Sequence, residues 1–164
     1  MFFIITNLFS PGKVPITETK TSSGVSVPAV TDDSNSENIQ WVTSNKQEVW
    51  IELFFDSITA VSIVKVFNKD GCTASDSYDL KVSAKKDDQY ILDCTEVDRR
   101  SRKRYDCALQ FRCGWWTEAT SVKITDVSPT YDGENVVMKI TEVIIGRAAI
   151  MSVGMKYKYF LSFY

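Results

Sequence analysis

The chain has 164 residues, of which 44% are hydrophobic and 24% charged, and its net charge is -2 at neutral pH. This length suffices for one domain with a hydrophobic core, and the charge gives no basis for a nucleic-acid partner or an anionic membrane surface. There is no histidine, which excludes serine–histidine and cysteine–histidine catalytic pairs and histidine-ligated zinc. No apolar run reaches the roughly 18 residues of a membrane span.

The opening stretch "MFFIITNLFSPGK" is apolar but lacks the basic segment of a secretory signal peptide. A complete leader is therefore not visible, and we expect that the true start lies upstream in a longer protein or that the sequence begins within a larger architecture. The next segment, Thr19–Asn38, is polar and contains Gly24 and Pro28. It is predicted to be a loop or an irregular edge.

Short runs rich in β-branched and aromatic residues follow, with turn-forming residues between them, and helical apolar spacing is absent. The predicted strands are Val49–Phe55, Ala60–Phe67, Tyr78–Ala84, Gln89–Leu92, Cys107–Cys113, Ser121–Val127 and Val136–Ile145. Short strands at this spacing predict an all-β antiparallel sandwich or barrel. The basic, aromatic tail "MSVGMKYKYFLSFY" departs from the pattern and is predicted to be an extension or the beginning of a following domain.

Side-chain alternation gives three expectations for the later strands. In "CALQFRC" one face is apolar and is expected to be buried; it carries Cys107, Leu109, Phe111 and Cys113. In "CGWWTE" the adjacent Trp115 and Trp116 would point to opposite sides of a strand, so one is predicted in the core and the other partly exposed. In "VVMKITEVII" the carboxylate of Glu142 falls in an apolar row, so it requires a cation, an arginine or a hydrated strand end.

The four cysteines permit three disulfide pairings, and none forms a CxxC motif. A disulfide framework in an oxidising compartment is one interpretation, and four buried thiols in a cytosolic protein is the other. The segment "DRRSRKRY" carries five basic residues between Arg99 and Arg104. It would attract sulfated glycans, anionic lipid or a processing protease, or it is a solvated connection between strands.

Several segments, in this order, resemble the F5/8 type C (discoidin) family: "TNLFSPGKVPITETKTSSG", "AVTDDSNSENIQW", "EVWIELFFDSITAVSIVKVFNKDGC" and "MKITEVIIG". The cysteine after the loop and the "FRCG" strand are most similar to the fucolectin branch. The resemblance implies a jelly-roll β-sandwich of the galactose-binding-domain-like type. It covers residues 6–147 as one domain and leaves residues 148–164 as a C-terminal extension of unknown structure.

Fucolectins hold a structural calcium ion between an early loop and the last strand, and the resemblance carries this site over. The acidic ligands would be Asp32 and Glu142, and the further oxygen donors Ala29, Ser34, Thr141 and either Thr43 or Ser44. Hard oxygen ligands of this kind suit calcium. Alternatively, Asp32 and Asp33 only cap turns and Glu142 lies at a hydrated strand end.

In fucolectins the loop after the second predicted strand binds fucose through two arginines, aided by a histidine. Here Lys69 and Asp76 occupy the arginine positions, so a fork of fixed hydrogen-bond donors is lost at both. We therefore expect no measurable binding of free fucose. Another glycan would be bound by Lys69, Asp70 and Asp76 with Trp41 as a stacking face; otherwise the segment is an ordinary exposed charged loop.

The resemblance also implies that Cys94 pairs with Cys113, which leaves Cys72 and Cys107 to each other. The resulting hypothesis is a non-enzymatic, calcium-stabilised, lectin-like module that is secreted or forms the ectodomain of a larger protein, with cell-surface glycans or glycoproteins as partners. No nucleophile with a base, and no catalytic carboxylate pair, can be assigned. The alternative is a structural or protein-interaction domain that binds no sugar.

Overall fold

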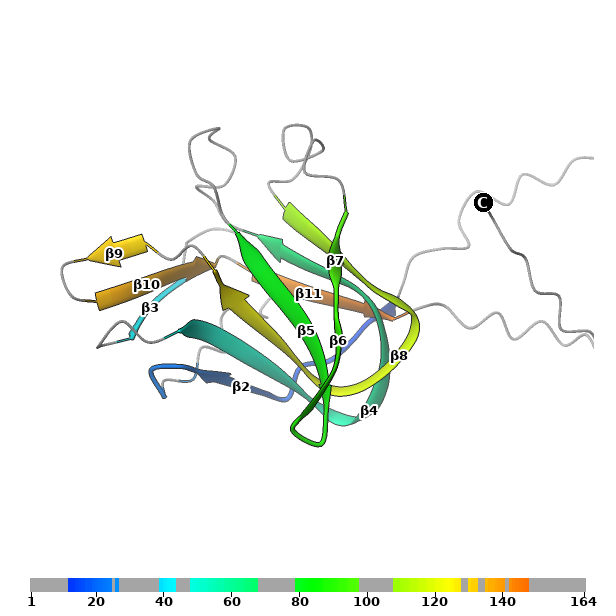
Figure 1. Cartoon of the computed structure of the whole chain (residues 1–164). Helices are drawn as coiled ribbons and strands as arrows, with labels where there is room; N and C mark the ends of the chain where they lie inside the picture. The colour runs from blue at the N-terminus through cyan, green and yellow to red at the C-terminus, as the bar shows by residue number, and fades with distance from the viewer. Residues whose placement is uncertain are drawn as a thin grey trace, which may run out of the picture.

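The computed structural model describes residues 12–24, 26, 39–43, 48–67, 79–97, 108–127, 130–132, 135–140 and 142–147. Within these ranges there is no helix long and apolar enough to cross a membrane. Their regular structure consists of β-strands (Figure 1). The strands are β1 (Gly12–Lys13), β2 (Glu18–Thr21), β3 (Ile39–Thr43), β4 (Val49–Phe67), β5 (Leu80–Lys86), β6 (Gln89–Asp93), β7 (Thr95–Glu96), β8 (Ala108–Asp126), β9 (Thr130–Asp132), β10 (Asn135–Ile140) and β11 (Glu142–Arg147).

The two 19-residue strands β4 and β8 organise the fold. They pair antiparallel along their whole length, and the register shifts twice, between Phe54 and Thr59 and between Val61 and Ile63. Figure 1 shows both strands curving around one end of the molecule. The first half of β4 and the second half of β8 therefore belong to one layer, and the remaining halves belong to the other.

Each layer takes its other strands from distant parts of the sequence. The first layer adds β2 beside β4, β5 beside β8 and β6 beside β5; the second adds β11 beside β4, β1 beside β11 and β7 beside β8. Strands β3, β10 and β9 form a separate three-stranded sheet. All of these pairings are antiparallel, and the fold is a β-sandwich, which confirms the predicted fold class.

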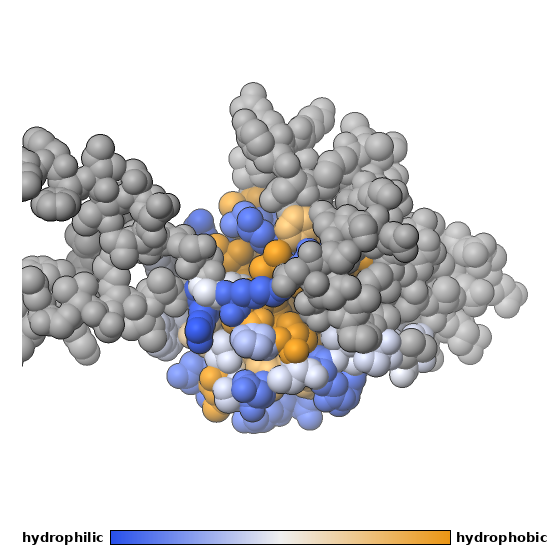
Figure 2. All heavy atoms as spheres, turned by 180° about the vertical axis from the view of Figure 1, so that it is seen from behind, coloured by the Kyte–Doolittle hydropathy of each residue, from blue (hydrophilic) through white to orange (hydrophobic). Residues whose placement is uncertain are grey.

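The core lies between the two layers and follows from period-2 alternation. Both halves of β4 contribute to one cluster, through Val49, Ile51, Leu53, Val61, Val64 and Val66. On β8 the predicted apolar face is confirmed where it is described, with Leu109 8%, Phe111 1% and Cys113 0% exposed. On the side seen in Figure 2, hydrophobic and hydrophilic side chains lie next to one another.

The predicted strand boundaries were wrong in several places; in one, Cys107–Cys113 and Ser121–Val127 were predicted as two strands but fall in the single strand β8. Val49–Phe55 and Ala60–Phe67 are one strand, because the polar residues between them lie on the outside of the bend of β4. Most of Glu18–Thr21 fell within the predicted loop Thr19–Asn38, but this segment forms strand β2, and its two threonines are buried. Val136–Ile145 is divided into β10 and β11, which join different sheets.

Candidate functional site

Of the predicted calcium ligands, Glu142 is the one whose side chain the structure describes. It is the first residue of β11, is paired with Phe67 at the end of β4, and is 4% exposed. Its predicted burial is therefore confirmed. Before Glu142 the buried apolar residues are Met138 and Ile140, at even positions. After it they are Val143 and Ile145, at odd positions, and Ile144 is only half-buried.

The other predicted calcium ligands lie almost entirely outside the described residues: Ala29, Asp32, Ser34 and Thr141. Thr43 ends β3 opposite Val136, whereas Ile140, two residues before Glu142, lies opposite Ile39. The backbones of Thr43 and Glu142 are thus placed toward opposite ends of this pairing, and the assignment of Thr43 stays a prediction. Among the described residues no group of three or more metal-ligating side chains occurs.

The predicted sugar-binding loop is also outside the described residues. This applies to Lys69, Asp70, Asp76, Cys72 and Cys107, to the basic segment Arg99–Arg104 and to residues 148–164. Trp41 lies in the middle of β3, where its backbone is opposite Met138. The assignment of these residues to a glycan site remains a prediction.

The predicted disulfide is confirmed: the Sγ atoms of Cys94 and Cys113 are 2.06 Å apart. Cys94 lies between β6 and β7, and its N–H donates a hydrogen bond to the carbonyl oxygen of Val82 at 2.7 Å. Cys113 belongs to the buried face of β8. The bond therefore ties the β6–β7 connection to β8 at the core.

Immediately after this cysteine, β8 has a bulge that was not predicted from the sequence. Arg112 is opposite Ile63 and Thr117 is opposite Val61, so four residues of β8 face a single residue of β4. Gly114 in this bulge has a φ of 91°, a value that favours glycine. A glycine inside a strand pattern, directly before two tryptophans, was the available signal for a bulge.

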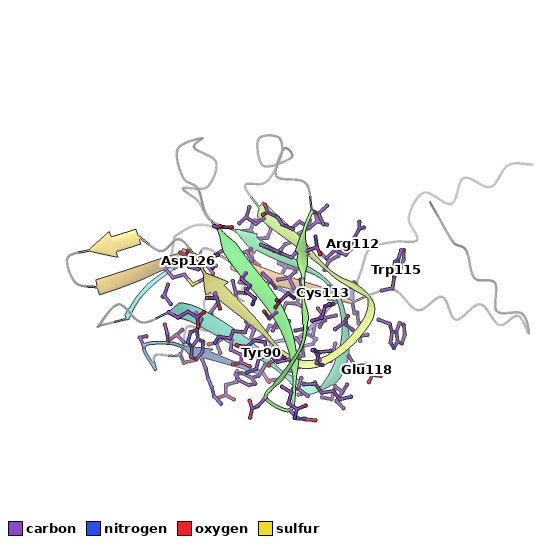
Figure 3. The ribbon with its side chains drawn as sticks, viewed as in Figure 1. Tyr90, Arg112, Cys113, Trp115, Glu118 and Asp126 are labelled. Atoms are coloured by element: carbon purple, nitrogen blue, oxygen red, sulfur yellow. A yellow bond between two sulfur atoms is a disulfide. The ribbon has the colours of Figure 1, made fainter. Side chains whose placement is uncertain are left out.

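The bulge overturns the prediction for the two tryptophans. Trp115 is 84% exposed and Trp116 is 57% exposed, so neither belongs to the core. The extra residues interrupt the alternation that would have turned one of them inward. In Figure 3, Trp115 projects away from the strands at the outside of the β8 curve, and Glu118 lies further along the same curve.

An open hollow lies beside the bulge, between the end of β5, strand β6 and β8. Its volume is about 480 Å³, and it is lined by Lys86, Ile91, Leu92, Trp116, Thr117 and Glu118. The ammonium group of Lys86 lies 3.3 Å from Oε2 of Glu118, so the charged groups of the lining form an ion pair. We refer to this set of six residues as the Trp116 hollow.

The outer face of the first layer carries lysines against aromatic rings. Lys123 Nζ lies 4.6 Å from the ring centre of Trp50, and Lys20 Nζ lies 4.5 Å from that of Phe54. Between them the buried Glu52 accepts hydrogen bonds from Lys85 and Ser121, both at 2.7 Å. These partners satisfy the carboxylate, so this cluster is a structural one.

One carboxyl group at the edge of this face has a shifted pKa. The Ser83 hydroxyl donates a hydrogen bond to Asp93 at 2.6 Å and lowers the pKa of Asp93 below its ordinary 3.8. Partial burial opposes this shift, and Lys81, whose Nζ is 3.2 Å from the carboxylate, adds to it. Asp93 is therefore ionised at neutral pH and offers no proton for acid catalysis.

The structure is similar to solved carbohydrate-binding modules. The CBM32 of AlyQ in complex with 4,5-unsaturated mannuronic acid superposes with a TM-score of 0.57 at 17% identity, over 82% of this chain and 97% of that one. A pectin-binding carbohydrate-binding module gives a TM-score of 0.59 at 15% identity, over 84% and 94% of the two chains. The chain has the fold of a CBM32 module.

This fold also includes fucose-binding domains, as the resemblance to fucolectins implied. A fucose binding module of Streptococcus pneumoniae superposes with a TM-score of 0.57 at 16% identity, over 82% of this chain and 91% of that one. Truncated AlyQ contains CBM32 and alginate lyase domains, and the chain spans only 33% of its length. No protein-family model and no curated protein sequence matches the chain.

Proposed function

We propose that the chain is a non-catalytic, lectin-like module that binds glycans. The observation that carries this proposal is the similarity of the fold to carbohydrate-binding modules over nearly their whole length, 97% for the AlyQ module and 94% for the pectin-binding one. Because one fold supports several functions, the ligand has to be argued from the residues. Substitution of the fucose-binding arginines by Lys69 and Asp76 favours a glycan other than free fucose.

The same proposal places the module outside the cell, in a secreted protein or an ectodomain. The bond between Cys94 and Cys113 supports this location, because disulfides persist mainly in oxidising compartments. A glycan-binding module would meet its ligand there.

A glycan array with the full chain tests the function. We expect saturable binding to one or more classes of glycan, and no signal above background from fucose monosaccharide. The array is repeated with calcium and with a chelator, which separates the binding itself from any dependence on the metal. Absence of binding to every glycan in both conditions would contradict the proposal and favour a protein-interaction domain.

We further propose that calcium stabilises the domain, with Glu142 and Asp32 as its acidic ligands. The support on the structural side is that Glu142 is 4% exposed at the start of β11, since a carboxylate this far from water is stabilised by a nearby cation. The donors carried over from the resemblance are all oxygen atoms, which is the chemistry calcium prefers. Bound there, calcium would supply positive charge and would join the early loop to the last strand.

Calcium is therefore expected to raise the melting temperature of the wild-type protein. At a calcium concentration about a hundred times the dissociation constant, the gain is about 2.7 kcal/mol of unfolding free energy. Thermal melts with calcium and with chelator measure it, and Glu142→Gln should remove the difference. Glu18→Gln is the control, because that side chain is 56% exposed. Identical melting curves with and without calcium in the wild type would contradict the proposal.

A further inference from the structure

The backbone of the β8 bulge is fixed at both of its ends. The Cys94–Cys113 bond anchors its first residue, and the Thr117 hydroxyl donates a hydrogen bond across it to the carbonyl oxygen of Cys113. A Cβ atom at Gly114 would lie only 3.1 Å from Oγ1 of Thr117, so this turn is closely packed as well as left-handed. The backbone that carries the two tryptophans is thus held in place by a disulfide and a hydrogen bond.

Exposed apolar side chains gather around this bulge. Besides Trp116, the neighbouring strand β6 exposes Ile91 to 47% and Leu92 to 40%, and all three line the Trp116 hollow. Leaving large apolar side chains in water is unfavourable, and their grouping in one place marks a binding surface more often than single exposed residues do. A rigid indole beside a hollow is suited to a flat ligand.

The chemistry of the lining favours an uncharged, hydroxyl-rich ligand. Lys86 and Glu118 neutralise each other as an ion pair, yet each keeps hydrogen-bonding capacity, as does the hydroxyl of Thr117. A hydroxyl group can accept from the ammonium and donate to the carboxylate. The volume of about 480 Å³ lies within the usual range of ligand sites, roughly 300–1,000 Å³.

We propose that the Trp116 hollow is a glycan subsite that binds a neutral pyranose residue, with one face of the sugar ring stacked on Trp116 and its hydroxyls bonded to Lys86 and Glu118. This inference rests on the proposed glycan-binding function and adds a second glycan site, separate from the predicted sugar-binding loop. The hollow is built from β5, β6 and β8, whereas the predicted sugar loop begins beyond the end of β4 at Phe67. Acidic sugars are disfavoured because their carboxylate would have to compete with Glu118 for the ammonium group of Lys86.

Affinity gel electrophoresis of the full chain tests the site, with galactomannan and a soluble β-glucan as neutral probes and polygalacturonate as the acidic one. We expect a neutral polymer to retard the wild type, and Trp116→Ala to weaken this binding at least about tenfold, as is typical for removal of an aromatic anchor. Trp115→Ala is the matched control, because that indole belongs to the same bulge and does not line the hollow; it should bind as the wild type does. Circular dichroism establishes that both variants are folded.

The location is checked by NMR titration with an oligosaccharide of the retarding polymer. The indole N–H resonance of Trp116, assigned from its loss in Trp116→Ala, should shift on binding. If Trp116→Ala binds as well as the wild type, or if only polygalacturonate binds, the subsite is wrong while the glycan-binding function stands. If neither the gels nor the array shows binding, both proposals are wrong. If sedimentation gives a dimer that Trp116→Ala dissociates without change in glycan binding, the hollow is an interface between two copies of the chain.

Discussion

Replacement of Glu52 by alanine is expected to lower the free energy of unfolding by about 3–5 kcal/mol, the usual cost of breaking a buried ion pair. Glu52 lies on the outer face of the first layer but is only 6% exposed. It accepts hydrogen bonds at 2.7 Å from both Lys85 and Ser121. The Lys85 side chain is itself 10% exposed, so the truncation removes its closest counter-charge in an environment poor in water.

Urea denaturation measures this loss of unfolding free energy. Two further variants show how much of it comes from burial of the ion pair. Glu48→Ala removes an exposed carboxylate 3.8 Å from Lys123, and we expect it to cost less than about 1 kcal/mol, as surface pairs do. The double variant Glu52→Leu with Lys85→Met should recover most of the stability, because replacing both members of a buried pair with apolar residues is often neutral. If Glu52→Ala were no more destabilising than Glu48→Ala, the cluster would contribute no more than a surface pair.

The second large effect is expected at the disulfide. Replacing Cys94 and Cys113 together by alanine should lower the free energy of unfolding by about 3 kcal/mol in the chain-entropy model, since the bond joins residues 19 positions apart. For a domain of this size the loss corresponds to a decrease of about 6–12 °C in the melting temperature. Calorimetry of the wild type and the double variant measures it.

Treating the wild type with a reductant provides the control for this prediction. The reduced wild type should melt close to the double variant treated with the same reductant, because both lack the Cys94–Cys113 constraint on the unfolded chain and any bond between Cys72 and Cys107 is broken in both. The double variant should also bind neutral glycans more weakly than the oxidised wild type, since the bond anchors the bulge that presents Trp116. Equal melting temperatures for oxidised and reduced wild type would show that the bond does not stabilise the fold.

Some features of the fold could be predicted from local sequence. β-Branched and aromatic runs identified the strands, and alternation identified the buried face of β8 through Leu109 and Phe111. The burial of Glu142 agrees with the predicted row, although within β11 it is Val143 and Ile145, on the opposite parity, that join the core. The pairing of Cys94 with Cys113 followed from the resemblance to fucolectins and not from the strand pattern, which left three pairings open.

The Glu52 cluster could not be predicted in this way. Glu52 and Lys85 alternate with core residues, so their pattern predicts exposed charges on a hydrated face. They are brought together because β4 and β5 both pair with β8, placing residues 33 positions apart in sequence within hydrogen-bonding distance. Their burial depends on this pairing and on neighbouring side chains.

The sequence by itself therefore determined which segments are strands and, in most of them, which face is buried, because both depend on residues one or two positions apart. The tertiary structure decided that β4 and β8 run continuously from one layer into the other, and where their register shifts. It alone placed Trp115 and Trp116 together on the outside, because a bulge exists only relative to a partner strand. The Trp116 hollow depends on the same long-range pairing, since its lining comes from three strands whose registers are fixed against one another.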